Sequence, residues 1–143
     1  PHDQNIECAI SSSKSKIEFC IYKEPALNGI NKNHYSKLNV TDNKIHESIF
    51  LEADTLENIL SKYIEHLPPN NFLTVDAEGH DLEILKSNNW IKFKFEWIIA
   101  ELSSFEITKT KENNIISYLN EKGYDLKGIT KRSGIFGLRQ NNP

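Results

Sequence analysis

Residues 72–86 read Phe-Leu-Thr-Val-Asp-Ala-Glu-Gly-His-Asp-Leu-Glu-Ile-Leu-Lys. The first four form a short apolar run of the kind found in buried strands, and the apolar spacing from Leu82 predicts a helix to about Asn88. Between them, Gly79 lets the backbone turn sharply. The stretch therefore predicts a strand, an acidic turn and a helix in immediate succession.

A similar pattern follows. The apolar run 97–100 ends at Glu101, and a second helix is predicted from about Lys111 to Lys122, with Gly123 as its stop signal. Unbroken apolar strands that alternate with helices are typical of a parallel sheet covered on both faces. The chain is therefore expected to be an α/β protein.

The last two strands are predicted to pair antiparallel. They span 124–130 and 135–140, and the four residues between them are too few for a crossover. An α/β sheet that ends in such a hairpin resembles the class I methyltransferase (Rossmann-like) fold, whose last strand runs antiparallel in a mostly parallel sheet.

The N-terminal half carries weaker signals. Alternating apolar residues predict strands around 6–10 and 17–21, joined as a hairpin within 1–23. A polar, aperiodic loop runs from Glu24 to Lys44, and a short apolar run at 49–51 ends the region 24–53. We expect one domain over 1–143, with the α/β core and its terminal hairpin in 54–143.

The core is predicted to begin with a helix. Asp54 and Glu57 have the spacing of a capping box, and an apolar stripe continues from Leu56 to Leu67 before Pro68 ends it.

Composition limits the function classes. The 143 residues carry 17 Lys+Arg against 20 Asp+Glu, a net charge of −3, which argues against a nucleic-acid partner. No apolar run is long enough to span a bilayer, so no membrane partner is expected. Cys8 and Cys20 favour two buried free thiols in a reducing cytoplasm, although a pair across the hairpin is geometrically possible. The absence of Met leads us to expect a fragment.

The candidate chemistry lies where the two core strands end. Asp76 and Glu78 follow the first strand and Glu101 follows the second, and ligands of open parallel sheets bind outside these carboxyl ends. His80 adds a titratable base close to two carboxylates. Asp81 is expected mainly to cap the helix.

At these residues the chain resembles a known family. Positions 74–86 are similar to the signature of the FkbM family of S-adenosylmethionine-dependent methyltransferases, nearly without gaps. Residues 53–56, 97–101 and 123–124 also resemble family segments, as do 8–11 and 24–28. The resemblance extends over essentially the whole chain.

The resemblance implies transfer of a methyl group from the cofactor S-adenosylmethionine to a hydroxyl on a small molecule or glycan, such as a sugar or secondary metabolite. Asp76, Glu78 and His80 are the catalytic candidates, either orienting the acceptor or taking its proton.

The resemblance also assigns binding roles. Ala9, Ile10 and Ser11 would lie near the adenine of the cofactor, with Asp76 as a further cofactor residue. The acceptor would be recognised by the 24–44 loop, through Asn28, and by Glu101. The acceptor itself is not identified, and nor is the oligomeric state.

Two family features have no counterpart in the sequence. The family places a Gly-rich turn after its first strand and an acidic residue after its second, and no Gly-x-Gly pattern occurs here. We therefore expect the 143 residues alone not to bind S-adenosylmethionine appreciably, and to fold marginally because strands of the sheet centre would become edges.

Two alternatives remain open. A metal-dependent nucleotide-sugar glycosyltransferase is one, because Asp76-Ala77-Glu78 imitates an Asp-x-Asp motif. A non-catalytic remnant of the fold is the other. A metal site built from Asp76, Glu78, His80 and Asp81 is disfavoured because helix geometry would spread these side chains, so no metal is predicted.

Overall fold

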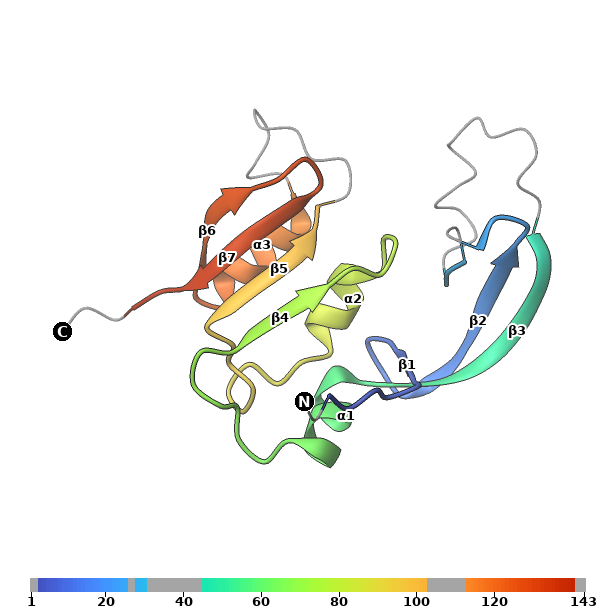
Figure 1. The fold of residues 1–143 in the computed structure, drawn as a ribbon, viewed down its shortest axis with the longest axis horizontal. Coiled ribbons are helices and arrows are strands. Elements are labelled where there is room, and N and C mark those ends of the chain that lie inside the picture. The colour runs from blue at the N-terminus through green and yellow to red at the C-terminus, as the bar shows by residue number, and fades with distance from the viewer. Residues whose placement is uncertain (1–2, 26–27, 31–44, 103–112, 141–143) are drawn as a thin grey trace.

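A computed structural model describes residues 3–25, 28–30, 45–102 and 113–140. Its strands and helices alternate from residue 45 to residue 129, which confirms an α/β protein, but the strands form two sheets (Figure 1). Most of the predicted 24–44 loop lies outside the described residues, as does the expected helix start at Lys111.

The N-terminal sheet consists of β1 (Ala9–Ile10), β2 (Ser15–Tyr22) and β3 (Ile45–Asp54) in the order β1-β3-β2. The predicted hairpin within 1–23 is wrong, because β3 lies between the other two strands. β1 pairs with it in parallel and β2 pairs with it antiparallel. The short run expected at 49–51 is one part of this ten-residue strand.

The chain passes from β3 directly into α1 (Leu56–Tyr63). The helix is capped by Thr55, whose hydroxyl accepts a hydrogen bond from the Asn58 N–H at 3.1 Å, and not by a capping box from Asp54. Asp54 instead binds the Thr55 N–H and the Lys62 ammonium. The helix also ends earlier than the apolar stripe predicts, at Tyr63.

The C-terminal sheet has the order β4-β5-β7-β6, formed by β4 (Phe72–Val75), β5 (Trp97–Glu101), β6 (Tyr124–Ile129) and β7 (Ser133–Leu138). β4 and β5 are parallel, whereas β7 runs antiparallel to both β5 and β6. The terminal hairpin is therefore confirmed. The expectation of a mostly parallel sheet is wrong for the described strands, because antiparallel pairs outnumber the parallel one.

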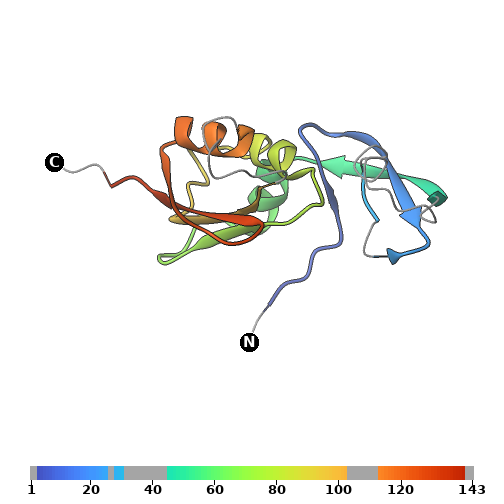
Figure 2. The ribbon, with the colours of Figure 1, turned by 90° about the horizontal axis from the view of Figure 1, so that it is seen from above.

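Helices α2 (Asp81–Lys86) and α3 (Asn114–Glu121) confirm the two predicted core helices. They lie on the same face of the C-terminal sheet (Figure 2). On β4 and β5, Phe72 and Trp97 are exposed. The sequence pattern predicted helices on both faces of this sheet. That prediction is not met by α2 and α3, because both lie on one face.

The core lies between α2, α3 and the C-terminal sheet. Six of its side chains have no exposed surface: Leu85, Phe93, Ile98, Leu119, Tyr124 and Phe136. The buried Tyr124 hydroxyl donates to the Phe95 carbonyl at 2.7 Å, so its polar atom is satisfied.

Both cysteines are free; Cys20 is buried as expected, whereas Cys8 is exposed. Within the described residues, none of the helices has the length and apolar character needed to cross a bilayer.

Candidate functional site

A cavity of about 670 Å³ opens between the N-terminal sheet and the acidic turn after β4. Ala9 and Ile10 line one side, and Asp76, Glu78 and His80 line the other. These two groups are more than sixty residues apart in the sequence. The structure thus brings predicted cofactor and catalytic residues to one cavity of a size typical for ligand sites.

The acidic turn has a special backbone. Glu78 and Gly79 both have positive φ, 47° and 90°. Glycine takes this conformation readily, but for glutamate it is uncommon and costs about 1 kcal/mol or more. Strained residues of this kind gather at functional sites when the surrounding structure fixes them, so Glu78 supports a site at this turn.

Asp81 fixes the turn. Its side chain is 1% exposed, and its carboxylate accepts hydrogen bonds from the Gly79 N–H at 3.2 Å and the Ala77 N–H at 3.4 Å. Burial raises the pKa of Asp81, while these backbone donors act in the opposite direction. The expected capping role is therefore modified: the N-cap position of α2 is His80, and Asp81 closes the turn that precedes the helix.

His80 is tied to the N-terminal sheet. Its Nε2 lies 3.3 Å from the Ser11 hydroxyl oxygen. Burial lowers the pKa of His80, and the carboxylates of Glu83 and Asp81 oppose this effect. The lowered pKa favours a neutral imidazole near pH 7, which is the form that can accept a proton.

Glu101 lies beside the turn but does not line the cavity. It follows Ala100, which pairs with Val75, so the ends of β4 and β5 meet as expected of parallel strands. Burial raises the pKa of Glu101, and the nearby Glu78, Asp81 and Asp76 raise it further. The side chain therefore shares the electrostatic field of the turn without contributing to the cavity wall.

Some of the remaining predicted residues line the cavity and others do not. Asn28 lines the cavity, and its side-chain oxygen accepts a hydrogen bond from the Tyr22 N–H at 2.8 Å. Ser11 is buried and does not line the cavity, and its N–H donates to the Asp54 carbonyl. Of the three residues expected near the adenine, Ala9 and Ile10 are in position to contact a ligand directly.

Sequence reasoning missed part of the wall. Glu7 and Cys8 precede β1, Phe19 lies on β2, and Leu51 and Glu52 come from β3. These residues reach the cavity because β1 pairs with the end of β3, placing Ala9 opposite Ala53. The only signal in the sequence was the alternation of apolar and polar residues in 45–54, and such alternation does not identify the strand with which a segment pairs.

The described residues contain no group of three or more His, Cys, Asp or Glu side chains arranged to hold a metal ion. Asp76, Glu78, His80 and Asp81 are thus close in sequence without converging as ligands.

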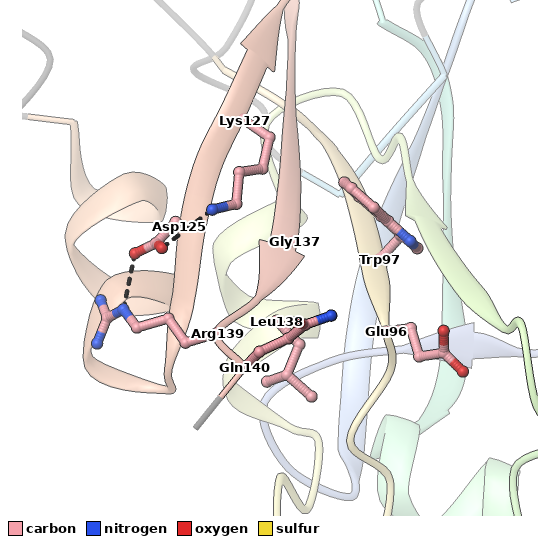
Figure 3. Close-up of a pocket in the computed structure, with 8 residues that line it drawn as sticks. All are labelled: Glu96, Trp97, Asp125, Lys127, Gly137, Leu138, Arg139 and Gln140. Carbon is pink, nitrogen blue, oxygen red and sulfur yellow. Dashed lines mark hydrogen bonds and ion pairs between the residues drawn. The ribbon is translucent and has the colours of Figure 1, made fainter. Parts of the chain in front are cut away.

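A second cavity, of about 740 Å³, lies over β5, β6 and β7 and contains none of the predicted site residues (Figure 3). Its Asp125 accepts hydrogen bonds from Arg139 at 2.7 Å and Lys127 at 3.2 Å. These two bonds lower the pKa of Asp125. Arg139 therefore ties the end of β7 to β6, whereas Lys127 pairs with Asp125 within β6.

Comparison with known proteins adds the family. Residues 1–126 match the family model of the methyltransferase FkbM domain, which is most of the chain and includes the whole cavity. Neither the curated proteins nor the solved structures provide a match. The matched segment includes β1, the acidic turn and Glu101, the same elements that meet around the cavity. The chain therefore belongs to the FkbM methyltransferase family.

Proposed function

We propose that the protein transfers a methyl group from S-adenosylmethionine to a hydroxyl of a small molecule or glycan, at the cavity between β1 and the acidic turn. One observation carries the proposal: the cavity unites Ala9 and Ile10 with Asp76, Glu78 and His80. The family supplies the reaction class, and the cavity supplies residues suited to it.

The cavity wall suits a positively charged donor. Glu7, Glu52, Asp76 and Glu78 contribute carboxylates, and no Lys or Arg occurs among the described lining residues. S-Adenosylmethionine would supply the methyl group on a positively charged sulfur, which leaves as a neutral thioether. A negative wall raises the local concentration of such a cation.

The wall also has an apolar side. Ile10, Leu51 and Ile84 face the cavity and could contact an aromatic base. A glycine-rich loop that could approach the carboxylate end of the donor is missing from the described lining. Weak donor binding by the 143-residue chain therefore remains part of the proposal.

His80 is the base in this scheme. S-Adenosylmethionine would supply the methyl group, and the His80 imidazole would take the proton that the acceptor hydroxyl loses. Asp76 and Glu78 orient the acceptor and offset the charge that develops on the ring. Asn28 contributes to acceptor binding from the cavity wall, whereas Glu101, which does not line the cavity, acts only through the negative charge that it shares with the turn.

The strand order supports the wider fold assignment. β4-β5-β7-β6 with an antiparallel β7 has the arrangement expected at the terminal end of a class I methyltransferase sheet. We infer from this order that the sheet is the terminal part of a Rossmann-like methyltransferase fold.

The glycosyltransferase alternative is less well supported by the wall. A nucleotide sugar carries a negatively charged diphosphate, which the four carboxylates would repel unless a divalent ion bridged them.

The test is methyl transfer from S-adenosylmethionine to a panel of hydroxyl acceptors, followed as release of the thioether product at saturating donor. H80Q should lower the rate by about 10²- to 10⁴-fold, since a general base contributes that much. H66Q, which changes an exposed histidine, is the control. The proposal would be contradicted if none of the hydroxyl acceptors were methylated, or if the protein transferred a sugar from a nucleotide sugar in the presence of manganese.

A further inference from the structure

A row of residues crosses the C-terminal sheet on the face away from α2 and α3. Phe72 of β4 pairs with Trp97 of β5, which pairs with Gly137 of β7. Gly137 in turn pairs with Asp125 of β6. Residues that are directly paired lie on the same face of a sheet, and Ile98, the next residue after Trp97, is buried in the core on the other face. The row spans about 14 Å, because neighbouring strands lie about 4.8 Å apart.

The two aromatic side chains of this row are exposed. Phe72 is 65% exposed and Trp97 is 45% exposed. Large apolar side chains that gather on a surface mark a place where a ligand or a partner binds. The open face of the sheet therefore carries a candidate binding surface of its own.

Gly137 allows Trp97 to lie close to the sheet. A Cβ atom at this position would lie 3.1 Å from Cζ3 of Trp97 and 3.2 Å from Cγ of Lys127, so both side chains approach the bare backbone of β7. Glycine inside a strand often marks a close approach of this kind. Figure 3 shows Trp97 on one side of Gly137, with Lys127 and Asp125 on the other.

The polar groups around the indole carry no net charge. The described lining of this cavity of about 740 Å³ includes two carboxylates, two cations and one amide: Glu96, Asp125, Lys127, Arg139 and Gln140. Asp125 accepts hydrogen bonds from both cations, from Arg139 at 2.7 Å and from Lys127 at 3.2 Å. The wall therefore offers hydrogen-bond donors and acceptors without an excess charge that would attract an anion.

We propose that this surface binds an uncharged oligosaccharide. A sugar ring has a face of C–H groups, which can pack on an indole, and hydroxyls at its edge that both donate and accept hydrogen bonds. Trp97 supplies the apolar plane, and Asp125 and Gln140 supply polar groups in the same cavity. Phe72 extends the apolar strip along the row, which favours a ligand of more than one ring.

Other occupants fit the surface less well. A second copy of the chain would have to cover Lys127 and the Asp125–Arg139 pair, and charged residues are depleted at the centres of protein interfaces. A nucleotide could stack its base on Trp97, but both cations of the described lining are already bonded to Asp125 when the phosphate arrives. An uncharged sugar requires neither change.

The site is separate from that of the proposed function. The cavity beside Trp97 and the cavity beside the acidic turn share none of their described lining residues. Sugar binding on the sheet and methyl transfer at the turn can therefore be tested independently.

The experiment is an NMR titration of the ¹⁵N-labelled 143-residue chain. The neutral probes are cellotriose, maltotriose and the trimer of N-acetylglucosamine, and the comparison probes are trigalacturonate and adenosine. At least one neutral trisaccharide should shift the amide signals of Phe72, Trp97 and Gly137 and the indole N–H signal of Trp97, with a Kd of about 1 mM. Trigalacturonate and adenosine should bind more weakly than that sugar.

Two pairs of variants locate the binding. W97A should weaken binding by about tenfold or more, as expected for loss of an anchoring aromatic ring. F50A, which removes an exposed ring from β3, should leave it unchanged. G137A should weaken binding by about fivefold, because the new methyl group displaces the indole. G128A is its control, since a Cβ there would lie 3.7 Å from Cδ1 of Ile135, an ordinary contact.

The proposal is overturned if none of the three neutral trisaccharides shifts these signals, or if W97A binds as tightly as the wild-type protein. It is also overturned if trigalacturonate or adenosine binds more tightly than the neutral sugars. Signals of the row that shift with protein concentration in the absence of sugar would assign the face to a second copy of the chain and would overturn the proposal as well.

Discussion

The two sheets of the molecule are packed very differently. The core between the C-terminal sheet, α2 and α3 contains six side chains with no exposed surface, whereas the N-terminal sheet contributes only Cys20, Tyr22 and Ala53 to the described buried apolar residues. On β3, Phe50 is 66% exposed. The C-terminal sheet therefore provides the stable scaffold.

The candidate cavity lies where the loosely packed sheet meets the firmly packed one. Ligand-binding segments commonly belong to the less stable parts of a protein, because binding requires local opening. Here the acidic turn is anchored to the scaffold through α2, while Ala9 and Ile10 come from the sheet with little core. The comparison predicts that mutations in the two sheets have unequal effects on stability.

The largest difference should come from a matched pair of phenylalanines on strands. F136A removes a fully buried ring from β7 and should lower the free energy of unfolding by about 3–5 kcal/mol. F50A removes an exposed ring from β3 and should change it by less than about 0.5 kcal/mol. Urea denaturation measures both, and equal losses would contradict the comparison.

A pair of glycines gives the next effect. A Cβ at Gly134 would lie 2.8 Å from Cε2 of Phe136 and 3.0 Å from Cδ1 of Leu102, so G134A should cost about 1–3 kcal/mol of stability through overpacking. A Cβ at Gly29 would meet nothing within 4 Å, so G29A is the control. If G134A had the same free energy of unfolding as the wild-type protein, the close packing around Gly134 would be contradicted.

The helix caps give a smaller effect. T55A removes the hydroxyl that accepts from the Asn58 N–H and should cost about 1 kcal/mol. Hydrogen exchange should then increase in α1. N113A, the corresponding change at α3, should increase exchange in α3 and leave α1 protected. If either variant loosened both helices equally, the two helices would be coupled more tightly than their separate caps indicate.

The smallest expected effect is on how the free energy of unfolding depends on pH, and it comes from Glu101. Because the pKa of this carboxyl is raised from 4.5 in the folded protein, the stability it contributes is present below about pH 4.5 and is lost as pH rises through the raised value. E101Q should therefore show a shallower loss of stability over that range. E121Q, at an exposed glutamate, should follow the wild-type curve.

Local sequence patterns identified the C-terminal half well. The strand 72–75, the turn at Gly79 and α2 follow from hydrophobic periodicity and from the special backbone of glycine. These features depend on neighbouring residues, so the acidic side of the site could also be named from sequence.

The N-terminal half could not be predicted in this way. The pairing of β1 with β3 joins Ala9 to Ala53 across 44 positions, and alternation does not specify a distant partner. That pairing brings Glu52 and Leu51 to the cavity and Ser11 to His80. The missed residues are therefore those whose positions depend on long-range contacts.

The central claim is that both sheets contribute to one methyltransferase site. The most direct test is an NMR titration of the ¹⁵N-labelled 143-residue chain with S-adenosylmethionine and, separately, with its neutral thioether product.

We predict weak binding, with a Kd of about 1 mM. Amide shifts should change both at Ala9–Ile10 and at Asp76–His80, and the changes should be larger for the cationic donor. Shifts confined to one of these segments, shifts centred on Trp97 and Arg139, or equal responses to the two ligands would contradict the account.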